Sequence, residues 1–401
     1  MPSFLPLLFA VRAVQTPSGV DQAALDHLIA RCKESQSWGL VVMKDGKVVC
    51  DQDFGKPKYN NMMSATKAVT SMAVGALLTD RTLPDVDITV KNIYPAFHGG
   101  KRDYVTTRHL LEHSSGLALY SESEFPENRV AAALTVPIRS IPGAYFEYNN
   151  RAVDLLSGVI RQLAGKPLDL YAFSRIFQPL GILPGDFIWG SDPDGNPHGC
   201  AELAMRPRCM ALLGQLMLQK GMWEGKRILS EDYVERATHE SKVSSDHFGL
   251  YNNNSGWLWW ICQPHVTFEP ADYDRMVKAL KLDQTQKERL HQLVGSRFLS
   301  MENCEMNCLE AVGGLPKALA AGFKRIDSEK FPCTDQPVKD SDWEGFYANG
   351  WGGQYIMVLP SRGLVVVRTG GEGFQSADDP YKYEMPDMYN LASALVPQAT
   401  H

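Results

Sequence analysis

The chain has 401 residues, of which 44% are hydrophobic and 21% charged, a composition typical of a folded globular protein. Its 40 basic and 46 acidic residues give a net charge of −6 and form no long run of one sign, which argues against a nucleic-acid-binding surface. No apolar stretch approaches the roughly 18 residues that a membrane-spanning helix requires. The length suits two or three structural units, or one large domain with two lobes.

The chain begins with a short apolar run, residues 4–11, that no Lys or Arg precedes. A secretory signal has a basic start and a small-residue cleavage site, whereas here Arg12 stands among the small residues that follow the run. We therefore expect residues 1–20 to form an arm or strand on the body of the protein. A signal peptide is the alternative.

Three elements are predicted in the first fifth of the chain. Residues 21–34 favour a helix, because their apolar side chains recur on one face. An Asp-Gly pair at 45–46 separates two β-rich runs, 38–43 and 47–50, which is a strong hairpin signal. Residues 62–77 then read as a loop that enters an amphipathic helix.

Helical patterns dominate the middle of the chain, and strands return near its end. Residues 151–163 and 207–220 are predicted helices, and residues 290–301 carry a further helical stripe of apolar side chains. Two runs, 353–359 and 363–368, form a second predicted strand pair. A last helix is expected over residues 383–395.

Strands at both ends and helices between them predict an α+β protein with one antiparallel sheet completed by both ends of the chain. A helical lobe would be inserted between the two halves of the sheet. The predicted units are an arm (1–20), a discontinuous sheet domain (21–85 and 343–401), a helical lobe (86–262) and a partly helical insertion (263–342).

Ser64 and Lys67 lie three residues apart at the start of the predicted helix, so they share one helical face. A serine beside an unprotonated amine is one route to an activated nucleophile, and the helix N-terminus adds positive potential where an oxyanion would form. This spacing is common by chance, and a capping serine with a solvated lysine is the alternative.

Two further stretches carry the same chemistry. Tyr148 precedes a predicted helix for which Asn149 or Asn150 suits the N-cap, so Tyr148 would stand on the loop before that helix. Residues 349–354 are rich in glycine and open a strand, which lets a backbone or a substrate approach closely.

Ser64-x-x-Lys67, Tyr148-x-Asn150 and the glycine-rich strand opening, in this order, resemble the serine β-lactamase and penicillin-recognising family, and most of all its class C-like esterase and small-amide hydrolase branch. Residues 108–117 and 214–230 also resemble that branch. The resemblance implies a β-lactamase-like two-lobed fold, with an antiparallel sheet flanked by helices and an inserted, mainly helical lobe.

The resemblance also implies roles for individual residues. Ser64 would be the nucleophile that becomes acylated, with Lys67 and Tyr148 as its base pair. Asn150 would bind the Lys67 ammonium or a substrate carbonyl. The backbone amides of Ser64 and Gln354 would form the oxyanion hole.

One departure bears on the substrate. The third motif of the family usually opens with Lys or His, which meets a substrate carboxylate, whereas here the position is Trp351, followed by Gly352 and Gly353. We therefore expect Trp351, Gly352 and Gly353 to contact an uncharged or hydrophobic ester or small amide. A β-lactamase or D-Ala-D-Ala peptidase and a non-catalytic scaffold are the alternatives. Several aromatic residues either extend an acyl pocket or pack in the core: Trp257, Trp259, Trp260, Trp343, Phe346 and Tyr347.

Neither a metal nor an organic cofactor is expected. The 8 cysteines are too sparse for a disulfide scaffold, so buried free thiols are predicted, which favours the cytoplasm, with the periplasm or secretion as alternatives. Cys304 and Cys308 stand four residues apart but have no second Cys or His pair near them in the sequence. His109 and His113 lack the glutamate that follows the first His of a zinc-protease helix. The sequence leaves the oligomeric state open.

Overall fold

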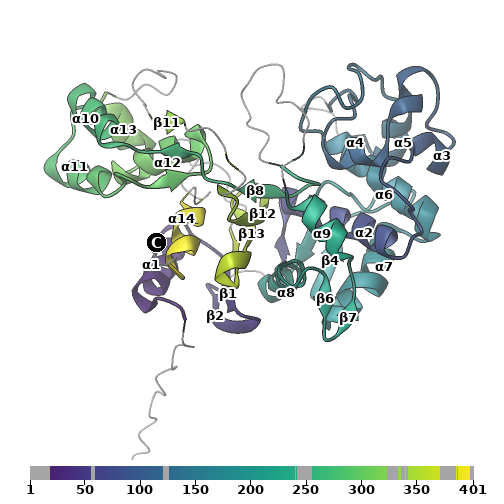
Figure 1. Ribbon diagram of the computed structural model, residues 1–401, viewed down its shortest axis with the longest axis horizontal. Helices are drawn as coiled ribbons and strands as arrows, with labels where there is room; N and C mark the ends of the chain where they lie inside the picture. The colour runs from purple at the N-terminus through teal and green to yellow at the C-terminus, as the bar shows by residue number, and fades with distance from the viewer. Residues whose placement is uncertain are drawn as a thin grey trace, which may run out of the picture.

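A computed structural model describes residues 19–55, 59–120, 126–239, 241, 255–322, 333–335, 339, 342–370, 385 and 387–397. A central antiparallel sheet lies between a helical lobe and a smaller group of helices, and a third lobe sits beside it (Figure 1). The predicted arm and its alternative concern residues of which 1–18 lie outside the described ones.

The six-stranded sheet has the order β2-β1-β14-β13-β12-β8. Its strands are β1 (Gly39–Lys44), β2 (Lys47–Asp53), β8 (Trp260–Cys262), β12 (Gly345–Gly350), β13 (Gln354–Leu359) and β14 (Leu364–Thr369). β1 pairs antiparallel with β14, so strands from the two ends of the chain lie side by side, as predicted. Both predicted hairpins are confirmed, and a third hairpin joins β12 to β13.

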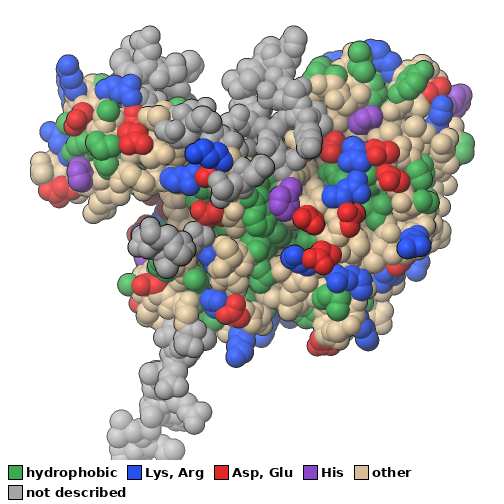
Figure 2. Space-filling view, in the orientation of Figure 1, with side chains coloured by type: hydrophobic (Ala, Val, Ile, Leu, Met, Phe, Trp, Pro, Cys, Tyr) green, Lys and Arg blue, Asp and Glu red, His purple; other side chains and the backbone are tan. Residues whose placement is uncertain are grey.

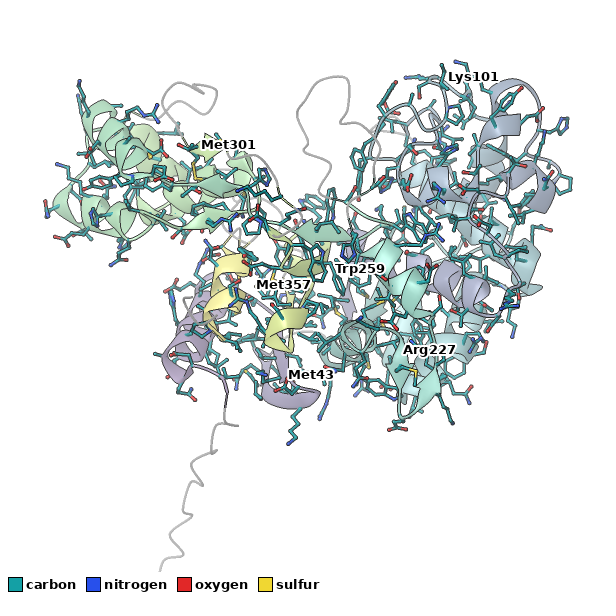
Figure 3. All side chains as sticks on the ribbon, viewed as in Figure 1. Met43, Lys101, Arg227, Trp259, Met301 and Met357 are labelled. Atoms are coloured by element: carbon teal, nitrogen blue, oxygen red, sulfur yellow. A yellow bond between two sulfur atoms is a disulfide. The ribbon has the colours of Figure 1, made fainter. Side chains whose placement is uncertain are left out.

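Helices cover both faces of the sheet, so every residue of β13 and of β14 is buried. One face packs against α1 (Gln22–Glu34) and α14 (Met388–Ala394) around an apolar core that includes Met357. The other face packs against α8 (Pro207–Leu218), where Gly214 lets the helix approach Ile356 closely. Met357 and Trp259, labelled in Figure 3, belong to the two different cores.

The helix that follows Ser64, α2 (Thr66–Thr79), is the centre of the helical lobe. Every residue from Thr66 to Leu77 is buried, so the helix is enclosed on all sides rather than amphipathic as predicted. Gly75 makes room for the ring of Tyr233, which lies where a side chain at this position would point. Acidic and basic side chains are interspersed on the outer face of this lobe (Figure 2).

The other helices of this lobe are α3 (Val90–Ile93), α4 (Thr107–Leu111), α5 (Arg129–Thr135), α6 (Asn150–Ala164), α7 (Leu168–Ala172) and α9 (Glu231–Ala237). Its short strands are β3 (Asn60–Asn61), β4 (Phe187–Trp189), β5 (Leu203–Met205), β6 (Met222–Trp223) and β7 (Lys226–Arg227). The predicted helices over 151–163 and 207–220 are confirmed as α6 and α8. The C-terminal helix is shorter than predicted, and residues 383, 384 and 386 lie outside the described ones.

Residues 263–342 contain a separate apolar core. The elements around it are β9 (Val266–Thr267), α10 (Pro270–Ala279), α11 (Gln284–His291), β10 (Arg297–Phe298), α12 (Met301–Ala311), α13 (Leu315–Ala320) and β11 (Thr334–Asp335). The predicted helical stripe over 290–301 is wrong, because β10 interrupts it between two helices. Arg31 on α1 forms an ion pair with Glu310 of this lobe at 3.4 Å. It also pairs with Asp387, next to α14 in the body of the protein, at 2.9 Å.

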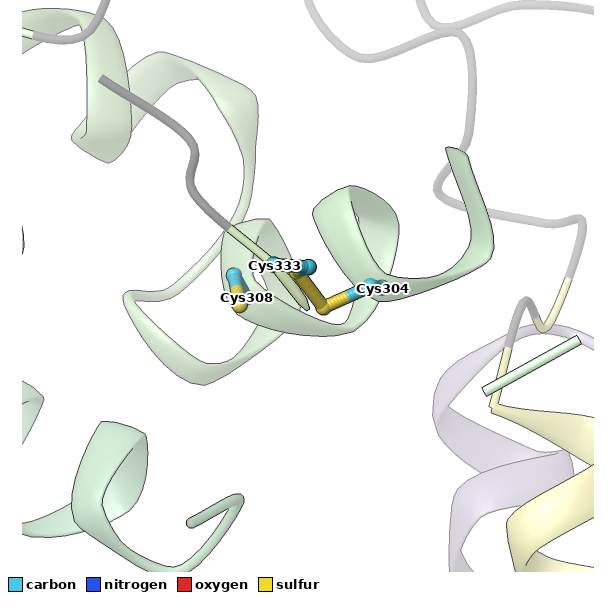
Figure 4. Close-up of side chains that lie close together, drawn as sticks. All are labelled: Cys304, Cys308 and Cys333. Atoms are coloured by element: carbon cyan, nitrogen blue, oxygen red, sulfur yellow. A yellow bond between two sulfur atoms is a disulfide. The ribbon is translucent and has the colours of Figure 1, made fainter. Parts of the chain in front are cut away.

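Cys304 and Cys333 form a disulfide, so the prediction of free thiols is wrong for these two residues. The prediction failed because Cys333 lies 29 residues away in the sequence, and only folding brings it to Cys304. Cys308 lies beside the bond, and the three Sγ atoms are within 4.8 Å of one another (Figure 4). Because the disulfide uses two of the sulfur atoms, a single thiol remains for any metal. The other cysteines are free and buried, as predicted: Cys32, Cys50, Cys200, Cys209, Cys262 and Cys308.

Within the described ranges, no helix has the length and apolar character that crossing a bilayer would demand.

Candidate active site

Ser64 stands on a constrained turn between β3 and α2. The turn is a 3₁₀ segment, Met63–Ala65, and Met63 has a φ of 48°, in the left-handed region that non-glycine residues rarely adopt. Two hydrogen bonds hold it there: Met63 N–H donates to Asn61 Oδ1 at 2.8 Å, and Met62 N–H donates to the Leu203 carbonyl at 2.8 Å. A strained conformation of this kind persists only where its surroundings fix it, and it is common at functional sites.

Lys67 lies one helical turn beyond Ser64 and points back to it. Its Nζ donates to Ser64 Oγ at 3.0 Å and to the Cys200 carbonyl at 2.8 Å. The side chain is buried, with only 3% exposure, so little water competes for the amine. The arrangement therefore places a hydroxyl and an amine in direct contact, as the sequence spacing predicts.

Tyr148 joins this pair from the loop before α6. Lys67 Nζ lies 5.0 Å from the centroid of the Tyr148 ring. The ring itself lies between two others: His113 at a centroid distance of 4.7 Å and Trp260 at 6.2 Å. The structure thus brings together Ser64, Lys67 and Tyr148, which are up to 84 positions apart in the sequence.

The two asparagines after Tyr148 have different environments. Asn149 is the N-cap of α6, where its Oδ1 accepts the Ala152 N–H at 3.1 Å and its Nδ2 donates to the Leu117 carbonyl at 2.6 Å. Asn150 is therefore released from the capping role. Its Oδ1 is buried and has no hydrogen-bond partner among the described residues, so the expected bond to Lys67 is not formed here. A buried acceptor without a partner is costly and is a candidate contact for a ligand donor.

The end of β12 lies directly against the Ser64 turn. A Cβ at Gly350 would be 2.1 Å from the Met62 carbonyl oxygen and 3.1 Å from the Ala65 nitrogen, so only glycine fits. The next three residues turn the chain into β13, with Gly352 at φ 78° and Gly353 at φ 73°. Trp351 is 53% exposed on this turn.

Gln354 is the first residue of β13, directly after the hairpin turn. It pairs with Gly350 across the hairpin, and its side chain exchanges two hydrogen bonds of 3.1 Å with Gly370. The Gly352 and Gly353 carbonyls accept hydrogen bonds from the buried guanidinium of Arg368, at 2.6 and 2.8 Å. The hairpin turn is therefore fixed from behind by side chains that sequence reasoning did not single out.

The strand face toward Ser64 carries uncharged residues, and the two nearest the Ser64 turn are small. Side chains alternate along a strand, so Ala348 shares a face with Gly350. Ala348 is buried, with 1% exposure, and belongs to the core on the α2 side of the sheet. β12 thus presents no cation on this face.

A buried polar network lies behind Lys67. The Cys200 N–H donates to Asp154 Oδ1 at 3.1 Å, while the Cys200 carbonyl accepts from Lys67. Burial raises the pKa of Asp154, and the nearby Arg129 guanidinium opposes this rise. Burial also raises the pKa of the Cys200 thiol to about 12, which keeps it protonated. Sequence reasoning missed Asp154, although an acidic residue on the apolar face of a predicted helix was an available signal.

The aromatic residues that were expected in an acyl pocket or in the core have different surroundings. Trp257 and Trp259 are buried in the core of the helical lobe and sheet. Trp260 stacks against Tyr148 at the site. Trp343 donates its indole N–H to the Thr238 carbonyl at 2.9 Å and stacks on His239.

The chain is similar in sequence to several known proteins. A family model described as "Beta-lactamase" matches residues 25–260. "Esterase EstB" of Burkholderia gladioli is 25% identical over 179 residues, which are 37% of this chain and 45% of the esterase. "Putative D-alanyl-D-alanine carboxypeptidase" of Escherichia coli K12 is 25% identical over 279 residues, 54% of this chain and 63% of that protein. The chain spans less than two thirds of the length of either relative.

Solved structures with the same architecture cover nearly the whole chain. A crystal structure described as a "putative beta-lactamase" from Bacteroides dorei aligns with a TM-score of 0.63 at 16% identity, over 94% of this chain and 100% of that one. "Putative 6-aminohexanoate-dimer hydrolase" from Bacillus anthracis aligns with a TM-score of 0.61 at 16% identity, over 92% and 83%. At these identities the matches show the fold alone, and they confirm the predicted two-lobed architecture.

Proposed function

The chain belongs to the Beta-lactamase family, and from this premise we propose that it is a serine hydrolase that forms an acyl-enzyme on Ser64. The observation that carries the proposal is the 3.0 Å contact between Lys67 Nζ and Ser64 Oγ, with a buried lysine and Tyr148 beside it. A scaffold without catalysis would not need a nucleophile and base in this geometry.

In the proposed reaction, Ser64 Oγ attacks the acyl carbon of the substrate and its proton passes to the Lys67–Tyr148 pair. The leaving alcohol or amine takes that proton as the tetrahedral intermediate collapses to the acyl-enzyme. Water then attacks the acyl carbon and gives its proton to the same pair. The carboxylic acid product departs as Ser64 Oγ recovers a proton, so the enzyme returns to its starting state.

The oxyanion hole would use the Ser64 N–H at the start of α2, where the helix dipole adds positive potential. The second donor was expected at Gln354. Because Gly350 meets the Ser64 turn directly, we propose the hairpin backbone adjoining Gly350 for this role. Gln354 is the alternative.

We propose an uncharged or hydrophobic ester or small amide as the substrate. Support comes from Ala348 and Gly350 on the strand face toward Ser64, which offer no charge to a substrate carboxylate, and from the exposed Trp351 on the adjoining turn. Asn150 Oδ1 would accept a donor from the substrate, with Gly352 and Gly353 in backbone contact. A β-lactam or D-Ala-D-Ala substrate is the alternative. The experiment includes it because one relative is described as a putative D-alanyl-D-alanine carboxypeptidase.

The test combines turnover with covalent labelling. The protein is assayed with p-nitrophenyl esters of two to eight carbons, nitrocefin and a D-Ala-D-Ala peptide, and then treated with a fluorophosphonate probe. We expect ester cleavage and one probe adduct on the Ser64 peptide, both lost in Ser64→Ala and kept in the matched variant Ser296→Ala in the insertion. Full turnover or labelling in Ser64→Ala would refute the proposal, and turnover of nitrocefin or the peptide alone would select the alternative substrates.

A further inference from the structure

His113, in the turn that follows α4, contacts the segment around Tyr148 through its backbone, its Nδ1 atom and its ring. The residue is buried, with 4% exposure, and has a φ of 53°, which is unusual for a residue with a side chain. Such a conformation is retained where the surrounding structure over-determines it.

Both neighbours of Tyr148 are hydrogen-bonded to His113. The Glu147 N–H donates to the His113 carbonyl at 2.7 Å, and the Asn149 N–H donates to His113 Nδ1 at 3.0 Å. One residue therefore fixes the backbone on either side of the tyrosine. Because Nδ1 is the acceptor, the neutral ring carries its proton on Nε2.

The imidazole also supports the ring of Tyr148. The two centroids are 4.7 Å apart with the planes tilted by 37°, and Trp260 lies on the tyrosine at 6.2 Å, nearly parallel at 13°. Phe146 meets the edge of His113 at 5.6 Å. Tyr148 is thus held between two aromatic rings within 5.0 Å of Lys67 Nζ.

The charge state of His113 suits this position. Burial, with a smaller contribution from the Lys67 ammonium, lowers the pKa of His113 to about 3. The groups that face it are Lys67 from α2, Tyr148 and Asn149 from the loop before α6, and Phe146. A neutral ring leaves Nδ1 free to accept from Asn149 and places no second cation beside Lys67.

We propose that His113 is a positioning residue that sets the place and tilt of the Tyr148 ring relative to Lys67 and Ser64. This inference rests on the proposed function, in which Tyr148 shares the role of base. His113 acts through two separable features: the Nδ1 acceptor, which fixes the backbone, and the ring face, which supports the phenol.

Two substitutions separate these features. His113→Asn keeps an acceptor near the place of Nδ1 but removes the ring, whereas His113→Phe keeps a ring and leaves the buried Asn149 N–H without its acceptor. His109→Asn is the matched control, since His109 lies four residues earlier and also accepts a backbone N–H through Nδ1, from Thr106 at 3.2 Å.

We expect His113→Phe and His113→Asn to lower kcat on the best ester by about 10- to 100-fold with KM within about twofold, because a catalytic group displaced by an ångström costs rates of this order. His109→Asn should keep the wild-type kcat. The decisive measurement is the double variant with Tyr148→Phe. If His113 acts through Tyr148, the second substitution adds less than about twofold to the loss. Wild-type kcat in both His113 variants, or losses that multiply with Tyr148→Phe, would overturn the proposal.

A readout without turnover separates this inference from the proposed function. The ultraviolet titration of Tyr148 is obtained as the difference between each protein and its Tyr148→Phe counterpart. We expect the titration midpoint to move in the His113 variants and not in His109→Asn. If the wild-type protein neither cleaves esters nor labels at Ser64, the proposed function fails, and an unchanged midpoint would independently refute the positioning role.

Discussion

A methyl group on Gly350 would sit 2.1 Å from the carbonyl oxygen of Met62, two residues before Ser64. The contact joins the sheet to the turn that carries Ser64 through backbone alone. No side-chain rotation can relieve this clash, because the methyl group is bonded directly to Cα and the carbonyl oxygen belongs to the main chain.

Gly350→Ala should therefore push the end of β12 away from the Ser64 turn. We expect kcat/KM to fall by at least about 100-fold, in line with the loss of an oxyanion donor, and stability to fall by about 1–3 kcal/mol from overpacking. Ester kinetics and urea unfolding give the two values. Gly185→Ala is the control, because open space surrounds that glycine and both values should stay near wild type. A fully active Gly350→Ala would contradict the backbone-contact account.

Lys67→Met should give a folded protein with little activity. The substitution keeps the length of the side chain and removes the amine that donates to Ser64 Oγ. General-base assistance is worth about 10²–10⁴-fold, so kcat should drop within that range while the melting temperature changes little. Lys67→Arg should not rescue the rate, because a guanidinium stays protonated and cannot act as a base. Rescue by arginine would mean that the charge alone matters.

Acidification should unfold the protein in part through His113. A histidine whose pKa is about 3 when folded and 6.5 when unfolded binds fewer protons in the native state, so stability is full above pH 6.5 and falls as pH drops toward 3. By pH 4 this group accounts for a loss of about 3 kcal/mol. Urea unfolding between pH 7 and pH 4 should show a shallower decline for His113→Asn. Parallel curves for the two proteins would show that His113 does not carry this dependence.

Reduction of the Cys304–Cys333 bond should loosen the lobe formed by residues 263–342. The bond closes a loop of 29 residues, for which chain entropy predicts a stabilisation of about 3–4 kcal/mol. Cys333→Ser should lower the melting temperature, whereas Cys308→Ala, in the same cluster but outside the bond, should have the smaller effect. Peptide mapping without reductant identifies the pairing. A disulfide that includes Cys308 in the native protein would contradict the Cys304–Cys333 pairing.

The contact between Ser64 and Lys67 was predictable because it is local. Ser64 and Lys67 are three residues apart, and helical geometry alone brings them to one face. The sheet was predictable for a similar reason, since each hairpin carries its own turn signal. The place of Tyr148 beside Lys67 was harder to predict. Neither sequence segment indicates it alone, and the prediction came from the family resemblance.

The structural supports of the site could not be read from the sequence. His113 lies in the stretch 108–117 that resembles the family, but its contacts with the Tyr148 segment, 35 positions away, arise only on folding. Gly350 is one of three glycines within four residues, and only the folded hairpin, in which Gly350 meets the Ser64 turn, distinguishes it from Gly352 and Gly353. Asn149 and Asn150 are adjacent and chemically identical, and only the start of α6 assigns the cap to the first of them.

The pairing of β1 with β14 has a consequence for synthesis of the protein on the ribosome. The turn that carries Ser64 is made early, but β12, which touches it, is complete only at residue 350, and β14, which pairs with β1, only at residue 369. Chains are translated at about 5–20 residues per second, so the half-built protein carries Ser64 for many seconds before β12 arrives. An incomplete chain that ends before β12 cannot assemble the site, so we expect the proposed hydrolytic activity only when translation is nearly finished.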